Sequence, residues 1–250
     1  MQDDQNLYLL LEYLPGGELL TQIKEQRSLT LEDSRFYLAE VLVAIQQLHE
    51  NHIIYRDLKP ENILLDRRGH IKLIDFGFAK QLGDLRRDRA RTNCGTPAYA
   101  APEVLIGAGY GYKADIWSFG ILICEILGGF TPFGPKAMEM GSAQDGFGGG
   151  NLGGMVAMPP QHIIETVNSG RMVLPKNLTP QTRDVVRKIL VADPSMRLEI
   201  RDIMRHKFFE GVDWRAVAQK QARPPYVPDP ADTRHLLNMP SVPQQTIAEE

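Results

Sequence analysis

The chain has 250 residues, of which 43% are hydrophobic and 24% are charged, a composition typical of a globular protein with a packed core. A net charge of -3 gives no overall positive field to hold nucleic acid or an anionic membrane. Two cysteines are too few for a disulfide framework, and the longest apolar stretch, near 116–126, is too short to span a membrane. We expect a cytoplasmic protein, with the nucleus as a second compartment, and neither nucleic acid nor a membrane as partner.

The first predicted element is a buried strand over residues 7–14, a nearly continuous apolar run that ends at a Pro-Gly-Gly turn. A long amphipathic helix follows, because Thr30 and Asp33 resemble a capping box and apolar residues then recur at helical spacing up to His52. Three short β-type runs come next, with Asp66–Gly69 as the hairpin turn between the second and the third. These runs cover residues 53–55, 63–65 and 71–74.

The second half of the chain is predicted to be mainly helical. The stretch 115–127 is apolar on nearly every side, which is typical of a helix at the centre of a domain. Two more helices, each with a proline near its start, are predicted after Pro160 and after Thr179. Residues 134–158 contain eight glycines and only three charges, so we expect a flexible insertion, although its four methionines leave a docking surface as the alternative. A proline-rich tail is predicted to lie extended over the surface of this α+β fold.

Four short motifs follow one another through the middle of the chain. Residues 55–62 read Tyr-Arg-Asp-Leu-Lys-Pro-Glu-Asn and are followed, after one hairpin, by Asp-Phe-Gly at 75–77. Gly-Thr-Pro at 95–97 and Ala-Pro-Glu at 101–103 complete the series. In this order the motifs resemble the large lobe of a protein Ser/Thr kinase. Each motif alone marks only a turn in many proteins, so the interpretation rests on the whole set.

Further residues narrow the resemblance to the AGC group of kinases, nearest to the cyclic-nucleotide-dependent (cAMP-dependent) catalytic subunits. The residues that carry it are Tyr55, Phe78-Ala79-Lys80, Asp213-Trp214 and the proline strap 224–228. The resemblance implies a protein-kinase-like fold with a mostly helical large lobe and a small lobe reduced to its last strand. Its parts are residues 1–14 as that strand and the hinge, 15–209 as the large lobe with the insertion 134–158, and 210–250 as the AGC-type tail.

The same resemblance implies ATP and Mg²⁺ as cofactors and transfer of the γ-phosphoryl group to a Ser or Thr side chain. Asp57 would orient the substrate hydroxyl and accept its proton, while Lys59 would neutralise charge on the transferred group. Asn62 and Asp75 would hold magnesium, which prefers oxygen ligands. In isolation Asp57, Asn62 and Asp75 are ordinary turn or cap residues, so their roles depend on the joint spacing. The residues implied to line the ATP site are Leu11 as gatekeeper, Glu12, Leu14, Glu18, Glu61 and Leu64.

Substrate selection is also implied by the resemblance. Glu18, Glu61 and Glu125 match positions that bind arginines upstream of the target residue, because a carboxylate pairs with the planar guanidinium in a bidentate way. Thr96 would contact Asp57 and Lys59 and favour a Ser or Thr substrate. Glu18 alone would otherwise be a helix N-terminal carboxylate that the helix dipole favours. We therefore expect protein substrates with basic residues before the phosphorylated Ser or Thr.

Thr92 matches the phosphothreonine of the activation segment, the alternative being an unmodified loop threonine. An upstream activating kinase would add the phosphate, and Arg56 and Lys80 would bind it. Arg91 stands where cyclic-nucleotide-dependent kinases have a tryptophan that helps to dock a regulatory subunit, which weakens the expectation of that partner. Three residues are predicted to be structural: Glu103 and Arg197 as an ion pair, and Asp115 as an acceptor for the backbone of the 55–62 loop.

The sequence departs from the kinase pattern ahead of residue 7. The Gly-rich loop, strand lysine and helix glutamate that complete an ATP site are not among these 250 residues. We expect the chain as written to be nearly inactive, since loss of about 4 kcal/mol of alignment slows a reaction about a thousandfold. One alternative is a non-catalytic, pseudokinase-like binding module or scaffold. Another is a longer natural protein in which Met1 is not the true start.

Overall fold

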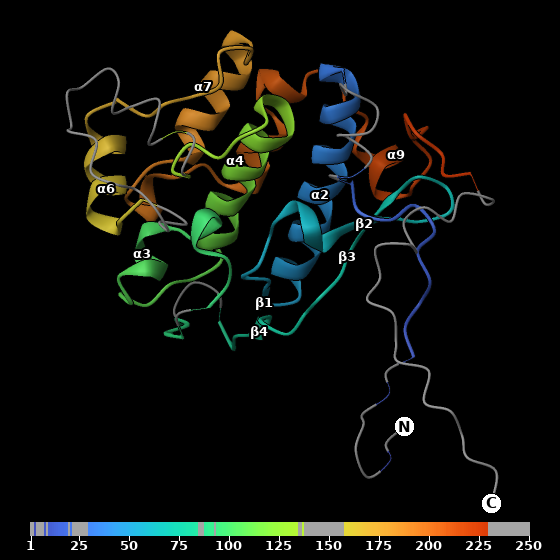
Figure 1. Cartoon of the computed structure of the whole chain (residues 1–250), viewed down its shortest axis with the longest axis horizontal. Coiled ribbons are helices and arrows are strands. Elements are labelled where there is room, and N and C mark those ends of the chain that lie inside the picture. Colours follow the sequence, from blue (N-terminus) through green and yellow to red (C-terminus); the bar gives the residue numbers. More distant parts are fainter. Residues whose placement is uncertain are drawn as a thin grey trace, which may run out of the picture.

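The structure is a computed structural model, and it describes residues 3, 8, 10–19, 21, 30–84, 88–92, 94–134, 137 and 158–229. Helices are the main regular structure of the described chain, and small antiparallel ribbons lie beside them (Figure 1), which confirms the predicted α+β class. The α-helices are α2 (Leu31–Glu50), α3 (Pro102–Leu105), α4 (Lys113–Gly128), α6 (Pro160–Asn168), α7 (Pro180–Ile189), α8 (Ile200–Met204) and α9 (Trp214–Ala218). The strands are β1 (Ile53–Ile54), β2 (Ile63–Leu65), β3 (Ile71–Leu73) and β4 (Lys80–Gln81).

Helix α2 begins as the sequence predicts. The Thr30 hydroxyl accepts from the Asp33 backbone N–H at 3.1 Å, and the Thr30 backbone N–H donates to the Asp33 carboxylate at 3.1 Å. This capping box satisfies two N–H groups that a helix start leaves without intrahelical partners. One face of α2 is buried against α4, α9 and the strands β1 and β3.

Helix α4 is the buried centre of the fold and lies between α2 and α7 (Figure 1). Trp117 and Phe119 have no exposed surface, and Gly129, with a positive φ of 75°, caps the end of the helix. Gly120 faces α7, where a Cβ would lie 2.6 Å from Ile189 Cγ2 and 2.8 Å from Leu190 Cδ2. The absence of a side chain at Gly120 therefore lets α4 and α7 approach closely. Within the described chain, no helix is long and apolar enough to span a membrane.

The two ribbons frame the polar loop 55–62. Strands β2 and β3 pair antiparallel with Leu64 opposite Lys72, and β1 pairs with β4. The predicted hairpin turn is confirmed, because Asp66 Oδ1 accepts from the backbone N–H groups of Arg68 at 2.8 Å and His70 at 3.1 Å. Burial alone would raise the pKa of Asp66, but these two hydrogen bonds hold it below its usual value.

The proline strap of the tail lies against the hairpin and the segment before α2. A Cβ on Gly69 would lie 1.9 Å from the carbonyl oxygen of Tyr226, and one on Gly16 would lie 2.8 Å from Pro228. The tail up to residue 229 is thus extended over the surface, as the sequence predicts. Residues 230–250 and almost all of the predicted insertion 134–158 lie outside the described residues.

The prediction of a buried strand over residues 7–14 is wrong for the residues that the structure describes there. None of residues 10–14 belongs to a strand, and Leu11 is 78% exposed. Leu14 is buried, and it marks where the segment meets the large helical part. An apolar run shows a tendency to be buried, but a strand also needs a neighbour for its backbone groups, and the pattern cannot show whether one is present.

We predict that Gly120→Ala destabilises the fold by about 1–3 kcal/mol, because the added methyl group overpacks the α4–α7 contact. Helix propensity alone predicts the opposite sign, a gain of about 1 kcal/mol. The free energy of unfolding from guanidinium titration distinguishes the two effects. Leu190→Ala removes one of the clashing groups, so the double variant should be more stable than the sum of the single effects. A stabilised Gly120→Ala variant would contradict the packing described above.

Candidate active site

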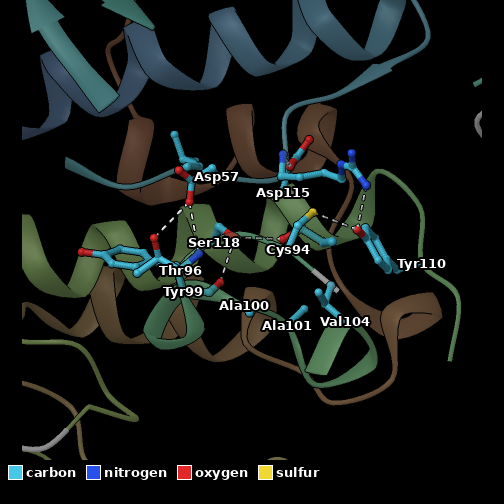
Figure 2. A pocket seen from close by; sticks show the side chains of 13 residues that line it. Asp57, Cys94, Thr96, Tyr99, Ala100, Ala101, Val104, Tyr110, Asp115 and Ser118 are labelled. Carbon is cyan, nitrogen blue, oxygen red and sulfur yellow. Dashed lines mark hydrogen bonds between the residues drawn. The ribbon is translucent and has the colours of Figure 1, made fainter. Parts of the chain in front are cut away.

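The loop 55–62 presents a buried carboxylate that is held from both sides. Asp57 is 3% exposed, and its Oδ1 accepts from the backbone N–H of Thr96 at 3.1 Å and from the Thr96 hydroxyl at 3.0 Å (Figure 2). Its Oδ2 accepts from Asn62 Nδ2 at 2.8 Å and lies 3.0 Å from Lys59 Nζ. Lys59 Nζ also donates to the Thr96 hydroxyl at 3.0 Å. The structure thus brings together four residues of the predicted site.

Asp115, in the first turn of α4, fixes the backbone that carries Asp57. The Asp115 carboxylate accepts from the backbone N–H groups of Tyr55 at 3.0 Å and Arg56 at 2.8 Å, and lies 2.7 Å from His49 Nε2. Arg56 has a φ of 71°, a left-handed conformation that costs free energy in a non-glycine residue and persists where surrounding contacts determine it. The expected contact between Asp115 and the loop is present in the structure.

Asp75 follows β3, two residues after the strand ends at Leu73. It is exposed, has a φ of 56°, and accepts from the Gly77 backbone N–H at 3.1 Å. The backbone N–H of Ile74 donates to the Asn62 carbonyl at 3.0 Å, so the chain next to Asp75 is tied to Asn62. The amide oxygen of Asn62 and the Asp75 carboxylate are hard oxygen ligands of the kind that suits Mg²⁺.

Tyr55 supports Asp75 from the interior. Its hydroxyl donates to the Ile74 carbonyl, and its ring packs edge-on against Phe76 with centroids 5.4 Å apart. Burial raises the pKa of the Tyr55 hydroxyl, so it remains a donor throughout the physiological range. Phe76 itself is 48% exposed, which is unusual for a residue in an apolar contact of this kind.

The segment that carries Thr92 is joined to the loop through Tyr110. The Tyr110 hydroxyl accepts from Arg56 Nη1 at 3.1 Å and lies 3.6 Å from Cys94 Sγ (Figure 2). It also donates to the Thr92 carbonyl at 2.7 Å. Burial is the main cause that raises the pKa of Tyr110 to about 12. Arg56 Nε also donates to the Phe78 carbonyl. Tyr110 was not among the predicted site residues, and no local sequence signal distinguishes it.

The Thr92 side chain is exposed, as a modification site requires. Arg56 is one of the two cations expected to bind the phosphate on Thr92. It is connected to the Thr92 backbone through the Tyr110 hydroxyl. Lys80 lies in β4 and is half-buried, and the described contacts include no hydrogen bond or ion pair from its ammonium group.

The predicted pair of Glu103 and Arg197 is present and almost fully buried. Arg197 Nη1 and Nη2 lie 2.6 and 2.7 Å from the two Glu103 oxygens, a bidentate arrangement. Arg197 is 2% exposed, and its guanidinium also donates to the carbonyls of Val191, Ala192 and Lys113. The Ala-Pro-Glu motif is thereby fixed to the start of α4.

The remaining predicted residues are spread more widely. Glu18 pairs with Leu64 through an isolated backbone bridge, while the exposed Glu12 binds Lys72. Glu61 is exposed at the start of the loop's 3₁₀ turn (Pro60–Asn62). Glu125 lies in α4 ten residues after Asp115, about 15 Å along the helix.

Residues 1–209 match the family of the protein kinase domain. The chain belongs to the protein kinase family. It is 40% identical to the human cAMP-dependent protein kinase catalytic subunit PRKX over 247 residues, which cover 97% of this chain and 62% of that protein. It is 37% identical to cAMP-dependent protein kinase catalytic subunit 3 and 36% identical to atypical protein kinase C, both of Drosophila melanogaster, over 96% of this chain and 38% of each relative. These relatives confirm the AGC-type resemblance, and the chain spans about three fifths or less of their lengths.

We predict that Asp115→Asn lowers the free energy of unfolding by more than about 2 kcal/mol, because charge-assisted hydrogen bonds to two backbone N–H groups are weakened or lost. Denaturant titration measures this change. Glu210→Gln is the control, since Glu210 is exposed and should change stability by less than about 0.5 kcal/mol. Equal stability of the two variants would show that Asp115 does not anchor the kinase loop.

Proposed function

We propose that this chain forms the catalytic large lobe of a Ser/Thr protein kinase that transfers the γ-phosphoryl group of Mg-ATP to proteins with arginines before the target residue. The observation that supports it best is the arrangement of Asp57, which is buried yet held by donors from Lys59, Asn62 and Thr96. A carboxylate fixed in this way is oriented before substrate binds, as general-base and positioning catalysis require.

The roles of these residues follow from their contacts. A substrate hydroxyl within hydrogen-bonding distance of Asp57 would give up its proton to that carboxylate as its oxygen attacks the γ-phosphorus. The bond between the γ-phosphorus and the β–γ bridging oxygen would break in the same step, with ADP as the leaving group. Lys59, which lies 3.0 Å from both Asp57 Oδ2 and Thr96 Oγ1, would place positive charge beside the transferred group. Mg²⁺, when bound, neutralises charge on the phosphates, and the oxygens of Asn62 and Asp75 would hold it.

The nucleotide would lie over β2, with Leu64 as the floor and the hinge segment 11–14 beside adenine. Leu14 is buried and Leu11 is exposed, and in this proposal these residues would supply one wall of an adenine site. A nucleotide with one wall remains partly hydrated, which lowers the alignment of its phosphates. We therefore propose slow transfer by the 250-residue chain alone.

Asp57→Asn should reduce phosphoryl transfer by at least about 100-fold, because the amide cannot accept the substrate proton. The measurement is incorporation of radiolabelled phosphate from Mg-ATP into a peptide with two arginines upstream of a single serine. Thermal unfolding of the variant, monitored in parallel, establishes that the loop remains folded.

A second peptide with alanines in place of the arginines tests the substrate class. The proposed acidic residues Glu18, Glu61 and Glu125 predict slower transfer to it, and equal rates for the two peptides would refute the basic preference. If neither peptide is labelled by the parent chain although ATP binds, the binding-module alternative gains support over the enzyme.

We also propose that an upstream kinase activates the protein by phosphorylating Thr92. The added dianion would draw on Arg56, which already reaches this segment through Tyr110. Amide hydrogen exchange across residues 94–99 should slow several-fold in protein that carries phosphothreonine at position 92. Arg56→Gln should remove most of this protection, whereas Arg205→Gln, an exposed control at the end of α8, should retain it. Protection that survives Arg56→Gln would assign the phosphate to other groups.

A further inference from the structure

An open cleft of about 610 Å³ lies between the hinge segment, the β2–β3 turn and the tail, on residues that do not contact Asp57. Its volume is within the range of about 300–1,000 Å³ that is typical of ligand sites. Its cationic side chains outnumber its carboxylates by four to two. The lining residues are Glu12, Tyr13, Leu14, Asp66, Arg67, Arg68, Lys72 and Lys220.

The cations are carried by rigid backbone. The turn is closed by hydrogen bonds from the Asp66 N–H to the His70 carbonyl at 2.8 Å and from the Gly69 N–H to the Asp66 carbonyl at 2.9 Å. On the other side, Lys220 Nζ donates to the Ile71 carbonyl at 2.8 Å, which joins the tail to the hairpin. The backbone that carries the cationic residues is therefore fixed before any ligand binds, so binding has to order mainly the side chains of Arg67 and Arg68.

The carboxylates in the cleft do not use all of this positive charge. Lys72 donates to Glu12 at 2.6 Å, and Arg68 Nη2 is 4.0 Å from Asp66 Oδ2, at the limit of an ion pair. Arg67 is exposed, and no hydrogen bond or ion pair of its side chain occurs within the described residues. Adjacent guanidinium groups on one tight turn are therefore available to an anion.

We propose that this cleft binds the phosphate group of a phosphoserine or phosphothreonine in an extended peptide segment of a partner protein. A phosphate monoester carries nearly two negative charges and three acceptor oxygens, which match two arginines and a nearby ammonium group. A single carboxylate would only replace those already in the cleft. Because the chain as a whole carries a net charge of -3, a local phosphate fits better than an anionic polymer or membrane.

Loss of the Glu12 charge is expected to have the opposite effect on phosphopeptide binding from loss of the arginines. A phosphate that reaches Lys72 must compete with the Glu12 carboxylate, since both bind the same ammonium group. Removing the charge of Glu12 should therefore tighten phosphopeptide binding, while removing the arginines should weaken it. Neither effect depends on phosphoryl transfer, so the proposal does not rest on the proposed function.

The test uses the full chain and a fluorescein-labelled pentapeptide, Glu-Ala-phosphoserine-Ala-Glu, with fluorescence anisotropy at physiological salt. We expect the double variant R67Q/R68Q to bind at least about 10-fold more weakly, since it removes two charge-assisted contacts to the phosphate. E12Q should bind about threefold more tightly. R187Q/R201Q, which removes exposed arginines from α7 and α8, is the matched control and should bind as the parent does.

The unphosphorylated pentapeptide and inorganic phosphate complete the set. Binding of the phosphopeptide alone supports a peptide site, and equal affinity for inorganic phosphate would reduce the cleft to a simple anion site, against the proposal. Equal binding of the unphosphorylated peptide, unchanged affinity in R67Q/R68Q, or no binding at millimolar phosphopeptide would each overturn it.

Discussion

The site depends on one buried carboxylate, that of Asp115, and on the need to satisfy it. Asp115 is 1% exposed, and an unpaired charge at that depth would cost several kcal/mol, on the order of the stability of a whole domain. Backbone N–H groups of Tyr55 and Arg56 supply the compensation, and the first turn of α4 adds the favourable end of a helix dipole. These bonds hold Arg56 in its left-handed conformation, and that conformation directs the next residue, Asp57, toward Thr96.

The start of α4 also anchors the segment that ends in Ala-Pro-Glu, again through a buried charge that is satisfied by hydrogen bonds. Arg197 donates to the Lys113 carbonyl at 3.0 Å, and Lys113 Nζ donates to the Arg197 carbonyl at 2.6 Å. The buried guanidinium also lies 4.9 Å from the centre of the Trp117 ring. Through Glu103, this junction positions the segment that ends in Ala-Pro-Glu. One helix end therefore sets the relative position of the loop with Asp57 and the segment with Thr96, two pieces of chain nearly forty residues apart.

The sequence predicts these features where the physical cause is local. The capping box at Thr30, the hairpin at Asp66 and the apolar helix α4 each depend on residues a few positions apart, and each is present. The convergence of Asp57 with Thr96 is not local and was inferred only from a family resemblance. The sequence does not predict Tyr110 as a site residue, because its hydroxyl binds Arg56 from 54 residues away and neither residue type nor spacing encodes that contact. The strand predicted over residues 7–14 is absent at residues 10–14, because hydrophobicity indicates a tendency to be buried, whereas a strand also requires a neighbouring segment to pair with.

The segment 11–17, which contains the hinge, is held by strong contacts at one end and by weak contacts at the other. Its inner end is held by hydrogen bonds from the Gly16 N–H to the Leu65 carbonyl at 3.1 Å and from the Leu65 N–H to the Gly17 carbonyl at 2.9 Å. Its outer end has the Glu12–Lys72 pair, whose side chains are 63% and 37% exposed. An exposed pair contributes about 1 kcal/mol or less, so it cannot fix the segment. Because so little free energy holds that pair together, an anion of higher charge can take the place of Glu12 at Lys72 while the buried backbone bonds keep the hinge attached to β2.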